Sequence, residues 1–345
     1  MSRVNETFSF DDVLLVPQKS SIASRDDIDL SISKGFLRME VPIVSSPMDT
    51  VTGSQMAAAM SKSGGLGVVH RYNSIEDQSA MVRNAFSSGA SNVAAAIGVT
   101  GDFMPRARAL KSSGVFVFCL DVAHGHHIMM ERALKSMKDS FGEEVILIAG
   151  NVATNDAFTD LSSWGADIVR VGIGGGSICS TRIQTGHGIP TLYSVMLCSS
   201  QREIDGSDTL IMADGGIKNS GDIVKSLSFG ADMVMLGSLF AGTEETPGDV
   251  IVSSSGEKRK VYRGMASKEA QTDWRGSARS LEGISSTVPF RGNVTDIMEE
   301  LAFNIKSGLS YSGAENIRQF QLKSKYVIQT SASQLESGTH ILRRS

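Results

Sequence analysis

Short apolar runs recur along the chain, and helical spacing of apolar residues follows most of them. Eight runs lie at 41–46, 65–70, 91–99, 114–125, 144–151, 166–174, 208–216 and 231–238. Near-continuous Val, Ile and Leu runs are typical of parallel strands that are buried on both faces. Helical patterning falls between them, at 75–89, 102–113, 127–141, 154–164 and 219–229. This alternation predicts an α/β fold, and eight runs favour a TIM (β/α)8 barrel over an open sheet.

Each apolar run ends in polar or glycine-rich residues. The endings read SSPMD, HRYN, DVAHG, AGN, GIGGGS, ADGG and LGS in chain order. In a barrel, the carboxyl ends of all strands open onto one face, and active sites lie there. Ordinary turn residues are the alternative interpretation. Because so many chemically rich turns follow one another, we expect them to converge on a site.

Three segments interrupt the strand–helix rhythm. They are the loop at 174–190, the polar and glycine-rich segment 250–293, and the polar tail 324–345. Long segments without regular structure are usually lids or disordered. We therefore expect a single (β/α)8-barrel catalytic domain over residues 1–345. Loop 174–190 is its predicted catalytic loop, 250–293 is a long active-site flap after the last strands, and the tail is expected to be extended.

Composition is that of an ordinary soluble protein. Hydrophobic residues make up 41%, charged residues 20%, and the formal net charge is −4. This charge gives no support for nucleic-acid binding, and no apolar run approaches the ~18 residues of a membrane span. The amino terminus does not resemble a signal peptide. We expect a cytoplasmic protein with neither a nucleic-acid nor a membrane partner.

The three cysteines are widely spaced, which fits neither a disulfide framework nor a zinc knuckle. Cys179 lies in the segment GIGGGSICSTR, where glycines permit left-handed torsions and close approach to a ligand. Its neighbour Arg182 favours a lowered thiol pKa and a nucleophilic role. The alternative is a small buried apolar residue, and this is what we expect for Cys119 and Cys198. Carbonyl groups in the glycine turn are suited to a monovalent cation.

Two consecutive predicted strands end in ADGG and MLGS. Asp214 is placed to accept hydrogen bonds from a ribose diol. Backbone N–H groups suited to a phosphate belong to Gly215, Gly216, Gly237 and Ser238. Phosphate sites after the last two strands are frequent in barrels.

Other polar residues carry weaker signals. The spacing of His124, His126 and His127 does not match a helical zinc pair, so we expect no metal there. His70 is expected to be a structural or pocket histidine. Trp274 and Arg275 would either stack on a base or hold the flap in place.

At GIGGGSICSTR the chain resembles the IMP dehydrogenase / GMP reductase family. The resemblance covers nearly the whole chain, because further blocks follow the family's order. They are FDDVLLVPQKS, SSPMDTVT, GGLGVVHR, AGNVAT, ADGGIKNSGDI, GADMVMLGS, AGTEETPG and YRGMAS. The resemblance implies a (β/α)8 barrel, a homotetramer and a purine nucleoside monophosphate as substrate.

The resemblance also implies roles for individual residues. The thiolate of Cys179 would attack C2 of the purine and give a covalent thioimidate, and Asp121 would face the nicotinamide ribose. The nucleotide would be held by Ser46, Met48, Asn151, Ser177, Asp214, Gly216, Gly237, Ser238, Tyr262, Gly264 and Met265. The carbonyls of Gly174, Gly176 and Cys179 resemble a potassium site. A neighbouring subunit's tail would complete it with the residues that correspond to Glu336, Ser337 and His340.

The flap bears on the choice between two reactions. The dehydrogenases of the family use an Arg-Tyr pair there to activate water, and residues 266–281 contain no tyrosine. Arg275 and Arg279 are candidates for a lone substitute. Thr181 and Glu282 match the dyad that GMP reductases use, and dehydrogenases hold similar residues, so the absent tyrosine carries more of the choice. We therefore expect a GMP reductase that uses NADPH, converting GMP to IMP and ammonia.

The alternative is an IMP dehydrogenase that oxidises IMP to XMP with NAD. ADGGIKNSGDI, AGTEETPG and the tail LESGTHI look closer to bacterial dehydrogenases, and GMAS departs from both versions of that block. The paired regulatory module of many dehydrogenases is absent, which suits reductases and shortened dehydrogenases alike. A third hypothesis is a nucleotide-binding barrel without redox turnover.

Overall fold

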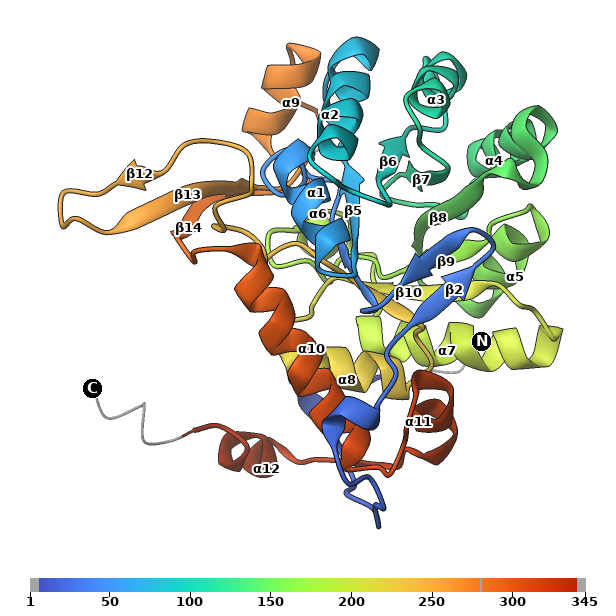
Figure 1. Cartoon of the computed structure of the whole chain (residues 1–345), viewed down its shortest axis with the longest axis vertical. Coiled ribbons are helices and arrows are strands. Elements are labelled where there is room, and N and C mark those ends of the chain that lie inside the picture. Colours follow the sequence, from blue (N-terminus) through green and yellow to red (C-terminus); the bar gives the residue numbers. More distant parts are fainter. Residues whose placement is uncertain (1–5, 280, 340–345) are drawn as a thin grey trace.

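The fold is a closed barrel of eight parallel strands (Figure 1). The structure, a computed structural model, describes residues 6–279 and 281–339. The barrel strands are β4 (Ile43–Ser45), β5 (Leu66–Val69), β6 (Ala94–Ile97), β7 (Val117–Asp121), β8 (Ile146–Val152), β9 (Ile168–Val171), β10 (Leu210–Asp214) and β11 (Met233–Leu236). Seven lie inside the predicted runs and β8 extends one residue beyond its run, to Val152, which confirms the predicted barrel.

Helices surround the strands. They are α1 (Ser54–Lys62), α2 (Ile75–Ser87), α3 (Phe103–Ser112), α4 (Ile128–Phe141), α5 (Asn155–Ser163), α7 (Thr191–Asp205), α8 (Ser220–Ser228) and α10 (Val294–Ser310). All five predicted helical segments are helices. Several begin where a polar side chain accepts a backbone N–H, as Ser74 does from Asp77 and Asn219 does from Asp222. Cys119 in β7 and Cys198 in α7 are buried, as expected.

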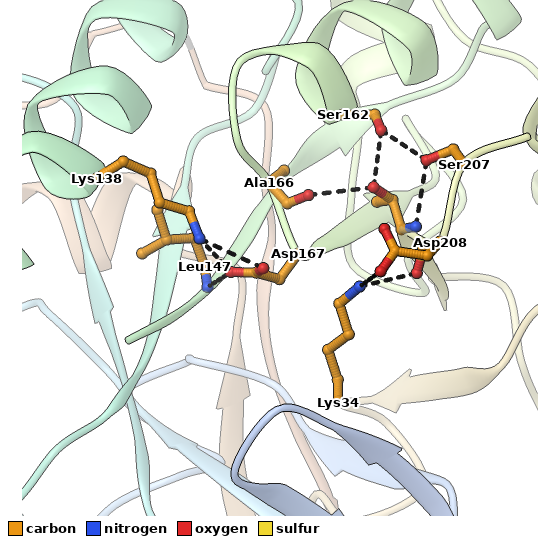
Figure 2. Close-up of polar contacts among 9 residues, drawn as sticks. Lys34, Lys138, Leu147, Ser162, Ala166, Asp167, Ser207 and Asp208 are labelled. Atoms are coloured by element: carbon orange, nitrogen blue, oxygen red, sulfur yellow. Dashed lines mark hydrogen bonds and ion pairs between the residues drawn. The ribbon is translucent and has the colours of Figure 1, made fainter. Parts of the chain in front are cut away.

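A hairpin closes the amino-terminal end of the barrel. Its strands are β2 (Ile32–Lys34) and β3 (Leu37–Met39), and Leu37 and Met39 are buried among the side chains that fill the barrel. The Lys34 ammonium donates to the Asp208 carboxylate at 2.8 Å (Figure 2). The same end is held by Asp167, which accepts from the Lys138 ammonium and from the backbone N–H of Leu147. This leaves the carboxyl end of the barrel open for a site.

The flap is an ordered structure. It forms an antiparallel sheet of β12 (Ile251–Val252), β13 (Lys258–Arg263) and β14 (Ser285–Pro289), with helix α9 (Lys268–Arg275) between the last two strands. The sheet projects from the barrel, as the orange strands of Figure 1 show. Loop 174–190 contains the short helix α6 (Thr181–Thr185). The expectation that these segments lack regular structure was therefore wrong, because backbone pairing within the flap organises them.

The tail is only partly extended. Strand β15 (Tyr326–Ile328) follows helix α11 (Ile317–Lys323) and pairs antiparallel with β1 (Val13–Leu15). Residues Ser331–Glu336 form helix α12, whose first turn is capped by the side chain of Thr330, so the extended prediction was wrong there. Short 3-10 helices cover Phe10–Asp12, Arg25–Asp27 and Gly142–Glu144. Within the described ranges, no helix has the length and apolar character that a membrane crossing requires.

Candidate active site

A cavity of about 540 Å³ opens at the carboxyl ends of the barrel strands. Every residue predicted for catalysis, nucleotide, cofactor or potassium binding in the main body of the chain lines it. These are Cys179, Thr181, Glu282, Ser46, Met48, Asn151, Ser177, Asp214, Gly216, Gly237, Ser238, Tyr262, Gly264, Met265, Asp121, Gly174 and Gly176. The predicted convergence of the strand endings is what the structure shows.

The catalytic loop is joined to the flap by backbone hydrogen bonds. The Ser180 N–H donates to the Glu282 carbonyl at 2.9 Å, and the Ile284 N–H donates to the Ile178 carbonyl at 3.0 Å. Cys179 bridges Gly283 between these two bonds. The segments are a hundred residues apart in sequence, yet their backbones align as a short antiparallel pair. The two halves of the predicted dyad therefore lie on facing segments beside the cysteine.

The thiol of Cys179 is exposed in the cavity. Its sulfur lies 3.1 Å from the Thr181 hydroxyl, within hydrogen-bond distance for a sulfur. The cysteine N–H donates to the Gly176 carbonyl at 3.1 Å, which turns the chain at this point. A hydroxyl can donate a hydrogen bond to a thiolate or accept one from a thiol. Thr181 can therefore stay hydrogen-bonded to Cys179 in either protonation state of the sulfur.

The glycine turn before the cysteine requires its small residues. Gly172 has φ of +145°, and a Cβ there would lie 1.9 Å from the Asp214 carbonyl oxygen. Gly174 has φ of +76°, a left-handed conformation that L side chains rarely adopt. These positions let the loop cross the end of β10 at close range. The loop therefore reaches the cavity because the turn lacks side chains.

Arg182 makes contacts that were not predicted from its closeness to Cys179. Its guanidinium donates to the Ile189 carbonyl at 2.7 Å and to the Ile173 carbonyl at 3.4 Å. Residues 173 and 189 mark the two ends of the loop and form an isolated bridge. Arg182 thus closes the base of the catalytic loop, and among the described hydrogen bonds the Cys179 sulfur is joined to Thr181 instead.

A buried arginine forms the floor of the cavity. Arg170 in β9 donates to the Asp121 carboxylate at 2.8 Å and to the Asp214 carboxylate at 2.9 Å. Burial alone would raise the pKa of Asp121, but the charges of Arg170 and Arg71 hold that pKa below its ordinary value. Asp121 is therefore ionised, and one guanidinium holds the side chains of both Asp121 and Asp214 in place.

Asn151 extends this floor. The register of β8 against β9 shifts between Gly150 and Val152, so Asn151 is displaced from the ladder toward the cavity. Its amide group donates to the Gly172 carbonyl and to the Asp214 carboxylate, both at 2.7 Å. Its carbonyl oxygen is buried without a partner among the described residues. That oxygen can accept a hydrogen bond from a ligand hydroxyl.

The opposite wall comes from the flap and the end of β11. Tyr262 in β13 places its hydroxyl 3.4 Å from the Ser177 hydroxyl. A Cβ on Gly237 would lie 3.0 Å from that tyrosine hydroxyl and 3.4 Å from the Met48 sulfur. Burial raises the pKa of Tyr262, so its hydroxyl keeps its proton. Gly237 consequently offers bare backbone in a narrow part of the cavity.

The flap helix is held against the barrel at the Asp121 side of the cavity. Trp274 packs edge-on against Tyr72 at 5.1 Å between ring centroids, and the Arg275 guanidinium lies 4.1 Å from the indole centroid. Of the two roles considered for Trp274, this contact corresponds to holding the flap in place. Tyr72 in turn lies 3.5 Å from the Asp121 carboxylate.

The histidine segment after β7 makes local contacts. His126 pairs with Asp160 at 2.7 Å, and the His127 ring accepts the Met129 N–H at the start of α4. His70 is buried and accepts the Tyr72 N–H. Within the described part of the chain, no cluster of three or more His, Cys, Asp or Glu side chains is arranged to hold a metal.

Arg170 and Tyr72 were not predicted individually as site residues. A signal for Arg170 was present, since a single arginine interrupts the apolar run 166–174 and a charge in a strand buried on both faces must be paired. Its partners come from strands far away in sequence, so no local pattern identifies them. Tyr72 belongs to the strand ending HRYN, which was expected to lie at the site, but its individual contacts with Asp121 and Trp274 were not predicted.

The eight parallel strands close into a barrel, so the protein is a (β/α)8 barrel. Its cysteine loop lines a cavity at the carboxyl ends of the strands, where the active sites of such barrels lie. Residues 7–340 match the sequence model of the IMP dehydrogenase / GMP reductase domain, and the chain belongs to this family. The family consists of oxidoreductases that act on purine nucleotides and use a nicotinamide dinucleotide cofactor.

Relatives of both activities resemble the chain over its whole length. An inosine-5′-monophosphate dehydrogenase from Borreliella burgdorferi is 34% identical, with 97% of each chain covered. A GMP reductase from Leishmania major is 29% identical, also with 97% of each covered. That alignment is 480 positions long, so the reductase contains inserted segments that this chain of 345 residues lacks. The lack of an insert therefore does not separate the two activities.

A solved structure of a relative also resembles the chain over almost its whole length. A cysteine-to-alanine variant of GMP reductase from Trypanosoma brucei, in complex with guanosine 5′-monophosphate, superposes with a TM-score of 0.91. It is 28% identical in sequence, and the match covers 98% of each chain.

Proposed function

We propose that the protein is a GMP reductase, which uses NADPH to convert GMP to IMP and ammonia. The observation that carries this proposal is the meeting of Cys179, Thr181 and Glu282 where the catalytic loop pairs with the flap. The flap residues 266–281 offer no tyrosine beside an arginine to activate water, so hydrolysis of a covalent adduct has no evident base in this segment. The known GMP reductases among its relatives agree with the proposal.

The chain's own residues account for the chemical steps. The Cys179 thiolate attacks C2 of the guanine ring, and the exocyclic amine leaves as ammonia after it gains a proton, which gives a thioimidate on the cysteine. Thr181 and Glu282 relay that proton. A nicotinamide cofactor bound beside Asp121 would supply the hydride to C2. The carbon–sulfur bond would then break and release IMP and the Cys179 thiolate.

The residues that line the cavity suit the two ligands. We assign the ribose diol to Asp214 and to the unpartnered Asn151 oxygen, and the phosphate to backbone N–H groups at Gly216, Gly237 and Ser238. The remaining nucleotide contacts would come from Ser46, Met48, Ser177, Tyr262, Gly264 and Met265. The part of the cavity beside Asp121 and Tyr72 would receive the nicotinamide ribose. A volume of about 540 Å³ is within the usual range for such ligands.

A potassium ion fits the proposed loop chemistry. Carbonyl oxygens of Gly174, Gly176 and Cys179 lie in one tight turn, and a hard monovalent cation prefers such neutral oxygens. By resemblance to the family, Glu336 and Ser337 of a neighbouring subunit would complete the site, while within one chain Ser337 hydrogen-bonds to Gln329 and Ser333. His340 lies outside the described residues. We propose a homotetramer in the cytoplasm, which light scattering of the purified protein and cell fractionation would test.

The alternative is an IMP dehydrogenase with NAD. Relatives of that activity from Borreliella burgdorferi and Cryptosporidium parvum are both 34% identical to the chain. A paired assay decides between them, following absorbance at 340 nm with GMP plus NADPH and, separately, IMP plus NAD. Loss of absorbance in the first mixture supports the reductase. NADH formation in the second, without turnover in the first, would replace it with the dehydrogenase, and turnover in neither would favour a binding protein.

A further inference from the structure

Lys260 is a buried cation on the flap strand β13. Its side chain is 3% exposed, and its ammonium donates to the carbonyls of Thr246, Thr243 and Glu244 at 2.5, 3.2 and 3.3 Å. An ammonium has three donors, and all three are used. Burial lowers the pKa of Lys260, and the carbonyl oxygens replace the water that the charge has lost. The lysine therefore occupies a cage of carbonyls of the kind that binds a free cation.

The cage is connected to the proposed phosphate site by a continuous series of turns. The Gly237 carbonyl accepts from the N–H groups of Phe240 and Ala241 at 3.1 and 2.9 Å. The Phe240 carbonyl accepts from Thr243 at 3.1 Å, and the Thr243 carbonyl accepts from Thr246 at 3.3 Å. Residues 237–246 therefore form one hydrogen-bonded unit, which we call the turn series. A shift at one end is transmitted to the other.

The same strand also contacts the start of the turn series. Tyr262 lies two residues beyond Lys260, and side chains two apart in a strand point to the same face. The Tyr262 hydroxyl approaches Gly237, where an added Cβ would lie 3.0 Å away. Strand β13 thus holds Gly237 through Tyr262 and residues 243–246 through Lys260.

We propose that Lys260 is a positioning residue for the nucleotide, whose ammonium fixes the turn series so that the N–H groups of Gly237 and Ser238 meet the 5′-phosphate. The proposal rests on the nucleotide site assigned above. Backbone donors bind phosphate well only when their direction is fixed, and the loss of one hydrogen bond to a charged group costs about tenfold or more in affinity. A tethered ammonium does this without depending on the ions in solution.

The test compares a nucleotide with its nucleoside. Calorimetric titration of Lys260→Met with IMP and with inosine measures the phosphate's contribution separately from that of the base and ribose. We expect IMP affinity to fall by at least about tenfold, while inosine affinity stays at the wild-type value. Lys258→Met, an exposed lysine on the same strand, is the matched control and should leave both affinities unchanged.

Other outcomes are equally decisive. An equal loss for IMP and inosine, or no loss for either, would overturn the positioning role of Lys260. If Lys260→Met does not fold, Lys260→Ala is titrated in ethylammonium and in sodium buffers, and recovery of IMP affinity in ethylammonium alone supports the proposal. Failure of every variant to fold would reduce Lys260 to a structural role. Equal binding of IMP and inosine by the wild-type protein would instead overturn the phosphate site itself.

Discussion

The sulfur of Cys179 lies 3.1 Å from the hydroxyl of Thr181, on a loop whose backbone pairs with the flap beside Glu282. This arrangement predicts a proton relay next to the nucleophile. Thr181→Ala should lower kcat by about 10²–10⁴-fold, because general acid–base catalysis typically contributes that much. Thr181→Ser keeps the hydroxyl and should keep most of the rate. Steady-state kinetics with GMP and NADPH check this, and similar rates for the two variants would remove Thr181 from the relay.

Cys179→Ala should abolish turnover and leave nucleotide binding in place. The covalent step has no substitute for the thiolate, whereas the binding contacts come from other segments of the cavity. Calorimetry with GMP and a 340 nm assay on one preparation separate the two effects. Measurable turnover by the variant would exclude the thioimidate.

We expect Arg170 to contribute far more to the free energy of unfolding than an exposed arginine does. Arg170→Met leaves the carboxylates of Asp121 and Asp214 buried without their shared partner, and breaking a buried pair costs about 3–5 kcal/mol. Arg38→Met, which removes an exposed pair with Glu40, should cost at most about 1 kcal/mol. Urea unfolding of both variants measures the difference. Similar losses of unfolding free energy in the two variants would show that Arg170 does not stabilise the floor of the cavity more than an exposed arginine would.

His70 should make the protein less stable in mild acid. Burial lowers the pKa of His70 below its ordinary value of 6.5, although Asp49 acts against this. Below about pH 6.5 the unfolded chain binds a proton that the folded histidine does not, so stability is lost as the pH falls from 6.5 toward the lowered pKa. His70→Gln should flatten this dependence between pH 7.5 and 5.5 in urea unfolding. An unchanged slope would point to other groups such as His124, whose pKa burial and neighbouring histidines also lower.

Trp274 should control the mobility of the flap helix. Trp274→Ala removes the contact with Tyr72, and we expect amide hydrogen exchange in α9 to rise while exchange in the barrel strands stays the same. Trp274→Phe retains an aromatic ring and should show a smaller rise. Equal exchange in all three proteins would mean that other contacts hold the helix.

The barrel and most of its site could be predicted because the sequence features that indicate them are local. Each strand is a continuous apolar run with its site residues directly after it, so the run fixes the position of Asp121 or Asp214 without knowledge of the partners. The roles of Arg170, Tyr72 and Lys260 depend on contacts with other elements, which periodicity does not encode. Asp214 and Asp121 lie 44 and 49 residues from Arg170, and Trp274 belongs to the flap, far in sequence from Tyr72. Arg182 shows the reverse case. Its closeness in sequence to Cys179 suggested an electrostatic role, and its side chain instead closes the loop.

The strands and the helix of the flap were not predicted for a similar reason. Its strands pair only with one another, and their exposed faces give no buried apolar run to read. The helix Ser331–Glu336, which the Thr330 hydroxyl caps, was not predicted because six residues are too few to show helical spacing of apolar positions.

The catalytic loop and the flap are joined through main-chain atoms at Ser180, Glu282, Ile178 and Ile284. Such bonds do not depend on which side chains the two segments present. The flap can therefore change its side chains around the cysteine without losing its attachment. Exchange of flap segments with the dehydrogenase from Borreliella burgdorferi or the reductase from Leishmania major is consequently a practical way to alter the cavity while the barrel stays the same.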